Sequence, residues 1–195
     1  MTTRRLHAGR SFAGTLLLAA AGCAWACGLE NPYSVASQRG IMNLAYPQSA
    51  WVRTAIWQAQ MEGELPRDPA PRSADFTPQG VAALQLMRAT GLLQLLARRL
   101  GTQPYAAQPP ALSVVLMGPM LWTRMEPQAG GGWQARVHVA GPEAGDVVIV
   151  TDTPAVEAVA VAGMGFERAI ELGLVRLYGP EPQVVAARTL LSATP

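Results

Sequence analysis

The chain lacks lysine and contains very little histidine. All fifteen of its basic residues are arginine, and its two histidines are His7 and His138. Without lysine there is no phosphate-loop lysine, no Schiff-base lysine and no Ser-Lys catalytic pair. With His7 in a predicted leader peptide, a zinc site of several imidazoles cannot form, and a Ser-His or Cys-His mechanism has one candidate base. We therefore predict a non-catalytic protein that needs no cofactor.

Cysteine and net charge are also low. Cys23 and Cys27 are the two cysteines, both near the start of the chain, so no internal disulfide framework can stabilise the fold. The formal net charge is +2, but three of the fifteen arginines lie within residues 1–26, and the remaining twelve face thirteen acidic residues. Nucleic-acid binding needs clustered positive charge, so we predict no nucleic-acid partner.

Residues 1–26 have the order of a secretory signal peptide. A short basic segment precedes an apolar run from Phe12 to Ala26, which is shorter than the roughly 20 residues that span a bilayer. The Ala-Trp-Ala ending at Ala26 fits ordinary cleavage, Cys23 fits a lipoprotein site, and a retained leader is the third possibility. We expect a periplasmic or secreted protein, or alternatively a membrane-anchored lipoprotein. A membrane partner is expected only with a lipidated Cys23 or a retained leader.

Helical patterns dominate the region after the leader. Residues 27–65 predict a helical N-terminal region, with one helix from Asn31-Pro32 to about Leu44 and a second from Ala50 to Glu62. The buried face of the second helix is predicted to hold Trp51, Val52, Ala55, Ile56 and Ala59. Residues 66–76 read as a proline-rich linker. A long helix, 77–100, follows, and its wide apolar face, including Leu84 and Met87, predicts burial on two sides.

The hydrophobic period changes to strand-like alternation after residue 110. We predict strands over residues 112–116, 121–126, 133–140, 146–151 and 174–178, and helices over 153–162, 166–172 and 181–191. Gly130-Gly131-Gly132 suits a hairpin between the second and third strands. The fold class is therefore α+β, in which N-terminal helices precede a mainly antiparallel five-stranded sheet packed against helices. Residues 77–195 form this α+β domain.

The second half of the chain resembles the sterol carrier protein family. The resemblance rests on the stretch from Asp146 to Asp152 (DVVIVTD), Gly163 between two helices, and the stretch from Gly173 to Gly179 (GLVRLYG). It covers roughly residues 110–192 and follows the family's order of strand, helix, short helix, strand and terminal helix. The resemblance implies a lipid-transfer fold whose sheet and helices enclose an apolar tunnel for acyl chains or sterols.

The leading functional hypothesis is an exported protein that binds an apolar small molecule or lipid between helix and sheet. The predicted pocket residues are Leu112, Val114, Leu116, Trp133, Val137, Val139 and Phe166. An alternative is a periplasmic accessory or scaffold protein that docks a protein partner through Asn31–Glu62. Trp122 and Trp133 flank the predicted hairpin and suit either a pocket or the core.

Two weaker patterns carry possible chemistry. Met117, Met120 and Met125 with His138 could hold cuprous ion, because thioethers and imidazole suit that metal, although methionine also fills cores. A copper-handling protein is therefore the third hypothesis. Glu167 and Glu171 share one helix face at i,i+4, which permits acid–base or cation chemistry but is typical of a solvated surface.

Overall fold

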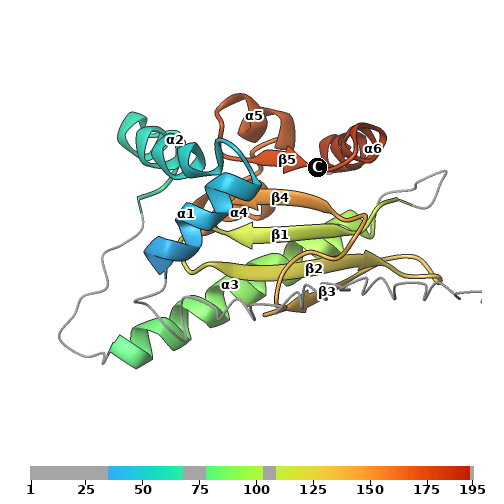
Figure 1. Cartoon of the computed structure of the whole chain (residues 1–195), viewed down its shortest axis with the longest axis horizontal. Coiled ribbons are helices and arrows are strands. Elements are labelled where there is room, and N and C mark those ends of the chain that lie inside the picture. The colour runs from blue at the N-terminus through green and yellow to red at the C-terminus, as the bar shows by residue number, and fades with distance from the viewer. Residues whose placement is uncertain (1–34, 68–77, 103–108, 194–195) are drawn as a thin grey trace, which may run out of the picture.

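A computed structural model of the chain describes residues 35–67, 78–102 and 109–193 (Figure 1). The predicted leader, Cys23, Cys27, the first residues of the predicted helix at Asn31 and most of the 66–76 linker lie outside these residues. The described elements are, in chain order, α1 (Val35–Ala45), α2 (Ser49–Glu62), α3 (Pro78–Leu100), β1 (Leu112–Leu116), β2 (Leu121–Pro127), β3 (Trp133–Val137), β4 (Val147–Thr151), α4 (Thr153–Ala160), α5 (Phe166–Glu171), β5 (Arg176–Tyr178) and α6 (Glu181–Ser192).

The five strands form one mixed sheet in the order β3-β2-β1-β4-β5. The β1–β4 pair is parallel, and the other three pairs are antiparallel. The predicted α+β class with a mainly antiparallel five-stranded sheet is therefore confirmed. Every residue of β1 and β4 is buried, because these two central strands are covered on both faces.

Helices lie on both sides of the sheet. One face carries Val114, Ile149 and Thr151, which line a small cavity together with residues of α3 and α4. The opposite face is crossed by α1 and by the chain that links β3 to β4 (Figure 1). By the strand register, Trp122 of β2, Val115 of β1 and Val150 of β4 lie side by side on this second face.

Helix α3 is buried in its second half only. Leu93 and Leu100 are fully buried, whereas Leu84 and Met87 are exposed, because the first half of the helix extends past the end of the sheet (Figure 1). The prediction of burial on two sides was therefore wrong for that half. In the described part of the chain, Gly80–Leu100 is long and apolar enough to cross a membrane by length and composition alone.

Helices α1 and α2 share the hydrophobic core of the sheet. Met42 and Val52 are fully buried in the same core cluster as β1 and β4. In the turn between the two helices, the Tyr46 ring packs against Trp122 at 6.3 Å and Tyr178 at 5.3 Å between ring centroids. The prediction that Trp51 belongs to the buried face of α2 was wrong, since its side chain is exposed.

Strand β3 ends three residues earlier than predicted. His138 adopts a φ of 67°, and the N–H groups of both His138 and Val139 donate to the carbonyl of Trp122. Two residues therefore face one partner residue, which is the arrangement of a β-bulge. This bulge ends the regular alternation that predicted a strand to residue 140.

Candidate functional site

The seven predicted pocket residues lie on or beside the sheet face that α3 and α4 cover. Leu112, Val114, Leu116, Trp133 and Phe166 are buried, and Val137 and Val139 are partly buried against the core. The strand register places Trp122 on the opposite face from Trp133, so the two indoles do not line a common space. These side chains form the core between the sheet and the helices.

A small cavity remains in this seam. Its volume is about 10 Å³, and two of the seven predicted residues, Val114 and Phe166, line it. The other lining residues are Leu96, Ile149, Thr151, Ala155, Val156, Val159 and Val175. A space of this size holds at most about one water molecule, whereas ligand pockets typically measure about 300–1,000 Å³. Entry of an acyl chain would require α3 or α4 to move away from the sheet.

The proposed copper ligands occupy different environments. Met117, Met120 and Met125 are buried in the core, whereas His138 is exposed on the bulge after β3. The described residues also include no group of three His, Cys, Asp or Glu side chains that could hold a metal ion. The three thioethers are placed as core side chains, which is the commoner use of methionine.

The paired glutamates of α5 form separate ion pairs. The carboxylate of Glu167 accepts hydrogen bonds from Arg188 and Ser192 of α6, and these contacts lower the pKa of Glu167 to about 2. Glu171 lies 3.6 Å from Arg168 on its own helix. Each carboxylate therefore has a cationic neighbour, and Glu167 joins α5 to α6.

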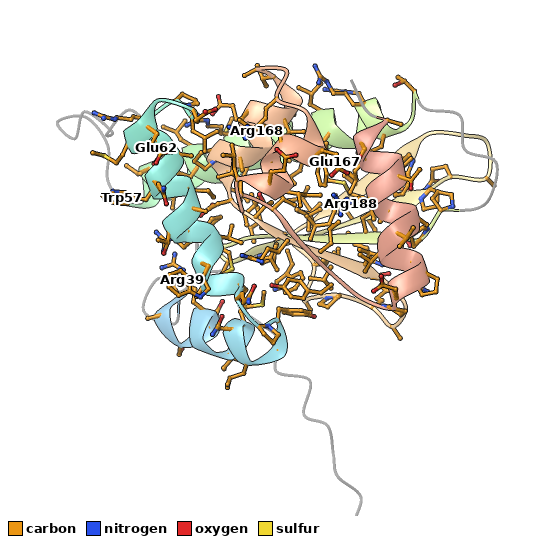
Figure 2. The ribbon with its side chains drawn as sticks, turned by 90° about the horizontal axis from the view of Figure 1, so that it is seen from above. Arg39, Trp57, Glu62, Glu167, Arg168 and Arg188 are labelled. Atoms are coloured by element: carbon orange, nitrogen blue, oxygen red, sulfur yellow. The ribbon has the colours of Figure 1, made fainter. Side chains whose placement is uncertain are left out.

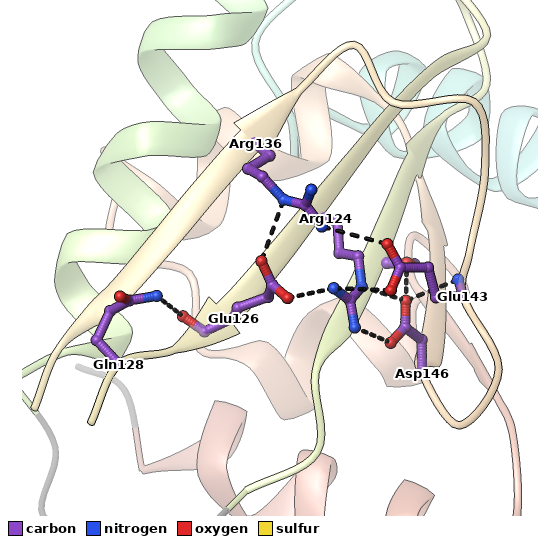
Figure 3. A network of polar contacts seen from close by, with 7 residues as sticks. Arg124, Glu126, Gln128, Arg136, Glu143 and Asp146 are labelled. Atoms are coloured by element: carbon purple, nitrogen blue, oxygen red, sulfur yellow. Dashed lines mark hydrogen bonds and ion pairs between the residues drawn. The ribbon is translucent and has the colours of Figure 1, made fainter.

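A network of charged side chains covers part of the second sheet face (Figure 3). Arg124 of β2 donates from Nε and Nη2 to the two carboxylate oxygens of Asp146, at 2.9 and 3.0 Å, and also binds Glu126. The Ser113 hydroxyl and the Glu143 N–H donate to Asp146 as well. Burial alone would raise the pKa of Asp146, but these hydrogen bonds outweigh it and lower the pKa. The network fixes the loop before β4.

A second polar cluster joins α1 and α2 to the ends of the parallel strands. Arg39 donates from Nε to the carbonyl of Met117 at 2.8 Å and from Nη2 to that of Gly118 at 2.6 Å. Burial lowers the pKa of Arg39, and the charge of Arg53 lowers it further. Arg53 also lies 4.0 Å from the carboxylate of Asp152.

Asp152 occupies the N-cap of α4 within this cluster. Its Oδ1 accepts the Thr153 N–H at 2.9 Å, and the Gly118 N–H also donates to its carboxylate. Burial raises the pKa of Asp152 despite these hydrogen bonds and the two nearby arginines. All of its close partners belong to the fold itself. The cluster is therefore a structural junction between the N-terminal helices and the sheet.

The outward sides of α1 and α2 carry large apolar side chains. We define the outer helical face by its five exposed members, which are Ile41, Leu44, Trp51, Trp57 and Met61. The two indoles are each 63% exposed and Leu44 is 83% exposed. Figure 2 shows Trp57 at the outer edge of α2, pointing away from the body of the molecule. Contiguous patches of exposed apolar groups mark binding surfaces in proteins.

The helix geometry groups the α2 members of this face. At about 100° per residue, Trp57, Met61 and Trp51 lie within an arc of roughly 120° that contains no charged residue. Arg53 borders the arc on one side and Glu62 on the other. Asn31–Glu62 is the docking segment predicted from the sequence, but the exposed apolar side chains on it were not predicted. Projecting residues 49–62 onto a helical wheel would have revealed the uncharged arc.

Comparisons with known proteins assign no family to the chain. No family model matches it, and no curated protein matches it. One solved structure with some likeness is a double mutant of the sec-alkyl sulfatase PisA1, with a TM-score of 0.36 and 16% sequence identity. The match covers 69% of this chain and 20% of the length of that protein.

Proposed function

We propose that the protein is a non-catalytic accessory protein of the cell envelope that docks onto another envelope component through the outer helical face. The observation that carries the proposal is the exposure of the two tryptophans on α2. A fully exposed large apolar side chain forgoes roughly 1.5–3 kcal/mol relative to burial. Buried aromatic anchors commonly dominate binding energy at interfaces. A component that covers Trp51 and Trp57 would gain that energy.

Site-specific photocrosslinking in living cells tests the docking surface. We expect Trp57→benzoylphenylalanine in the full chain to form an adduct after irradiation, because the docked component covers this position. Val185→benzoylphenylalanine on α6 is the matched control, since its valine is 54% exposed but lies outside the outer helical face. Denaturing mass spectrometry identifies each adduct. Equal labelling at the two positions, or no adduct at position 57, would reject the docking function.

Point substitutions are a cleaner test than deletion of Asn31–Glu62. Deletion would remove Met42 and Val52 from the shared core and leave the carbonyls of Met117 and Gly118 without Arg39. Loss of docking in such a variant would therefore reflect a damaged fold and would not test the docking surface. The exposed tryptophans, in contrast, can be changed with little effect on the core.

A carrier of an apolar ligand is the second candidate function. It is favoured by the small cavity at Val114 and Phe166, which lies in the predicted seam between helix and sheet. Native mass spectrometry of the protein from its own envelope distinguishes the two candidates. An extractable apolar molecule bound one to one would favour the carrier, and a bare chain would favour docking.

A further inference from the structure

The exposed apolar side chains concentrate on the three N-terminal helices. Among the described residues, nine large hydrophobic side chains are exposed, and seven of them lie on α1, α2 and α3. Five form the outer helical face, and the other two, Leu84 and Met87, lie on the first half of α3. Figure 1 shows this half of α3 extending past the same end of the sheet at which α1 and α2 lie. Most of the exposed large apolar side chains of the described residues therefore belong to helices that reach this end of the molecule.

The same helices are basic. Described residues 35–67 and 78–102 contain six arginines but only two acidic residues, Glu62 and Glu64. Residues 109–193 contain five arginines and eight acidic residues. Most of this excess lies on α3, where Arg88 pairs with Glu157 and Arg99 donates to the Val159 carbonyl. Residues 35–67 alone hold three arginines and two acidic residues, so α1 and α2 add a small positive charge to their apolar surface, which favours an anionic lipid surface modestly over a neutral one.

The chain before α1 places this end close to a membrane-seeking segment. The apolar run Phe12–Ala26 ends nine residues before Val35, and Cys23 is twelve residues before it. Since a chain spans at most about 3.6 Å per residue, Val35 lies within about 32 Å of Ala26 and about 43 Å of Cys23. A leader or lipid held in a bilayer would therefore keep the start of α1 within reach of the membrane surface.

The residue types on α2 suit the boundary between lipid and water. Tryptophan is enriched at this boundary because its large apolar ring can be buried while its indole N–H stays hydrated. Trp51 and Trp57 lie at the two edges of the uncharged arc, with Met61 between them. Arg53, at the border of the arc, can extend its guanidinium toward phosphate while its stem remains in the apolar layer.

We infer that the component covered by the outer helical face is an anionic bilayer surface, into which α2 inserts Trp51, Trp57 and Met61. This inference rests on the proposed docking function and names its occupant. Insertion buries the exposed apolar groups, and the half-exposed Arg53 supplies a small electrostatic attraction that salt weakens.

Vesicle flotation of the purified full chain tests the inference. We expect binding to vesicles of phosphatidylglycerol and phosphatidylethanolamine, and modestly weaker binding at high salt and to phosphatidylcholine vesicles. The double variant Trp51→Ser/Trp57→Ser should bind the anionic vesicles at least about tenfold more weakly, a loss of about 1.4 kcal/mol. The matched control is Val161→Ser/Val185→Ser, which removes two valines of 58% and 54% exposure outside the outer helical face. It should bind like the unchanged protein.

Two results would overturn the inference. These are no binding of the unchanged protein to anionic vesicles, and equal loss of binding in the valine and tryptophan variants. Circular dichroism and thermal unfolding must show that both double variants are folded. If position 57 crosslinks in cells but the protein ignores vesicles, docking stands and its occupant is a protein. If position 57 does not crosslink, the docking function itself fails.

Discussion

The arginine side chains of α1 and α2 have different bonding partners from those of the sheet region. In the sheet region, Arg124 is held by three carboxylates, and Arg188 is held by Glu167. On α1 and α2, Arg39 instead donates to backbone carbonyls and Arg53 only approaches Asp152. The outward side of these helices carries exposed tryptophan, leucine and methionine side chains. These arginines of the sheet region therefore pair with nearby carboxylates, whereas α1 and α2 expose an apolar surface suited to binding.

The largest expected effect tests whether the charge network of the sheet is structural. The substitution Arg124→Met leaves the Asp146 carboxylate, which is 2% exposed, without its main cationic partner. Removing one member of a buried ion pair typically costs about 3–5 kcal/mol, so urea denaturation should show a loss of this order in the free energy of unfolding. Vesicle binding at low denaturant should be unchanged, because the network lies on another part of the molecule.

Adding Asp146→Asn to that variant is the control. The amide is uncharged, so part of the lost stability should return if the cost comes from an unpaired buried carboxylate. A loss below about 1 kcal/mol for Arg124→Met would place the network among ordinary surface ion pairs. The charge network would then contribute little to the free energy of unfolding, and it would no longer set the sheet region apart from α1 and α2.

A smaller effect is expected where the two regions meet. The substitution Arg39→Met removes both hydrogen bonds to the carbonyls of Met117 and Gly118, and leaving such groups unsatisfied costs about 1–3 kcal/mol. The matched control is Arg53→Met, whose guanidinium is about half exposed and 4.0 Å from Asp152, and it should cost less than about 1 kcal/mol. Thermal unfolding checks both variants. Equal losses would show that Arg39 is not the main anchor of α1.

The elements of the fold were accessible from local sequence patterns. Each described helix and strand matches a predicted one, since proline starts, glycine stops and the change of period mark their ends along the chain. The error at Trp51 concerns the face of the helix. Trp51 is apolar like Val52, but side chains of neighbouring helix residues point about 100° apart, and the core contacts the side of α2 that carries Val52.

The candidate site was only partly accessible from the sequence. The segment Asn31–Glu62 could be proposed for docking because its helical patterns precede the predicted α+β domain and are separated from it by a predicted proline-rich linker. Which side chains remain exposed depends on how α1 and α2 pack on the sheet, and the sequence does not state this. The Arg39 contacts to Met117 and Gly118 join residues nearly eighty positions apart, with no motif to reveal them.

The smallest expected effect concerns the buried carboxylate at the junction, Asp152. Because burial raises its pKa, the folded state binds its proton more tightly than the unfolded state does. The stability from this protonated form is present below the unfolded-state pKa and is lost as the pH rises through the higher folded-state pKa. At neutral pH the charge on this buried carboxylate therefore opposes folding.

The substitution Asp152→Asn tests this sign. Asparagine also caps helices, so its oxygen can accept the Thr153 N–H, and the free energy of unfolding at pH 7 should change by less than about 1 kcal/mol. Urea denaturation at pH 7 and pH 4 should show the unchanged protein gaining stability relative to the variant at the lower pH. The opposite trend would mean that the charged form is favoured in the fold. Arg39 and Arg53 would then hold the helices to the sheet mainly by charge, and the junction would resemble the ion pairs of the sheet region.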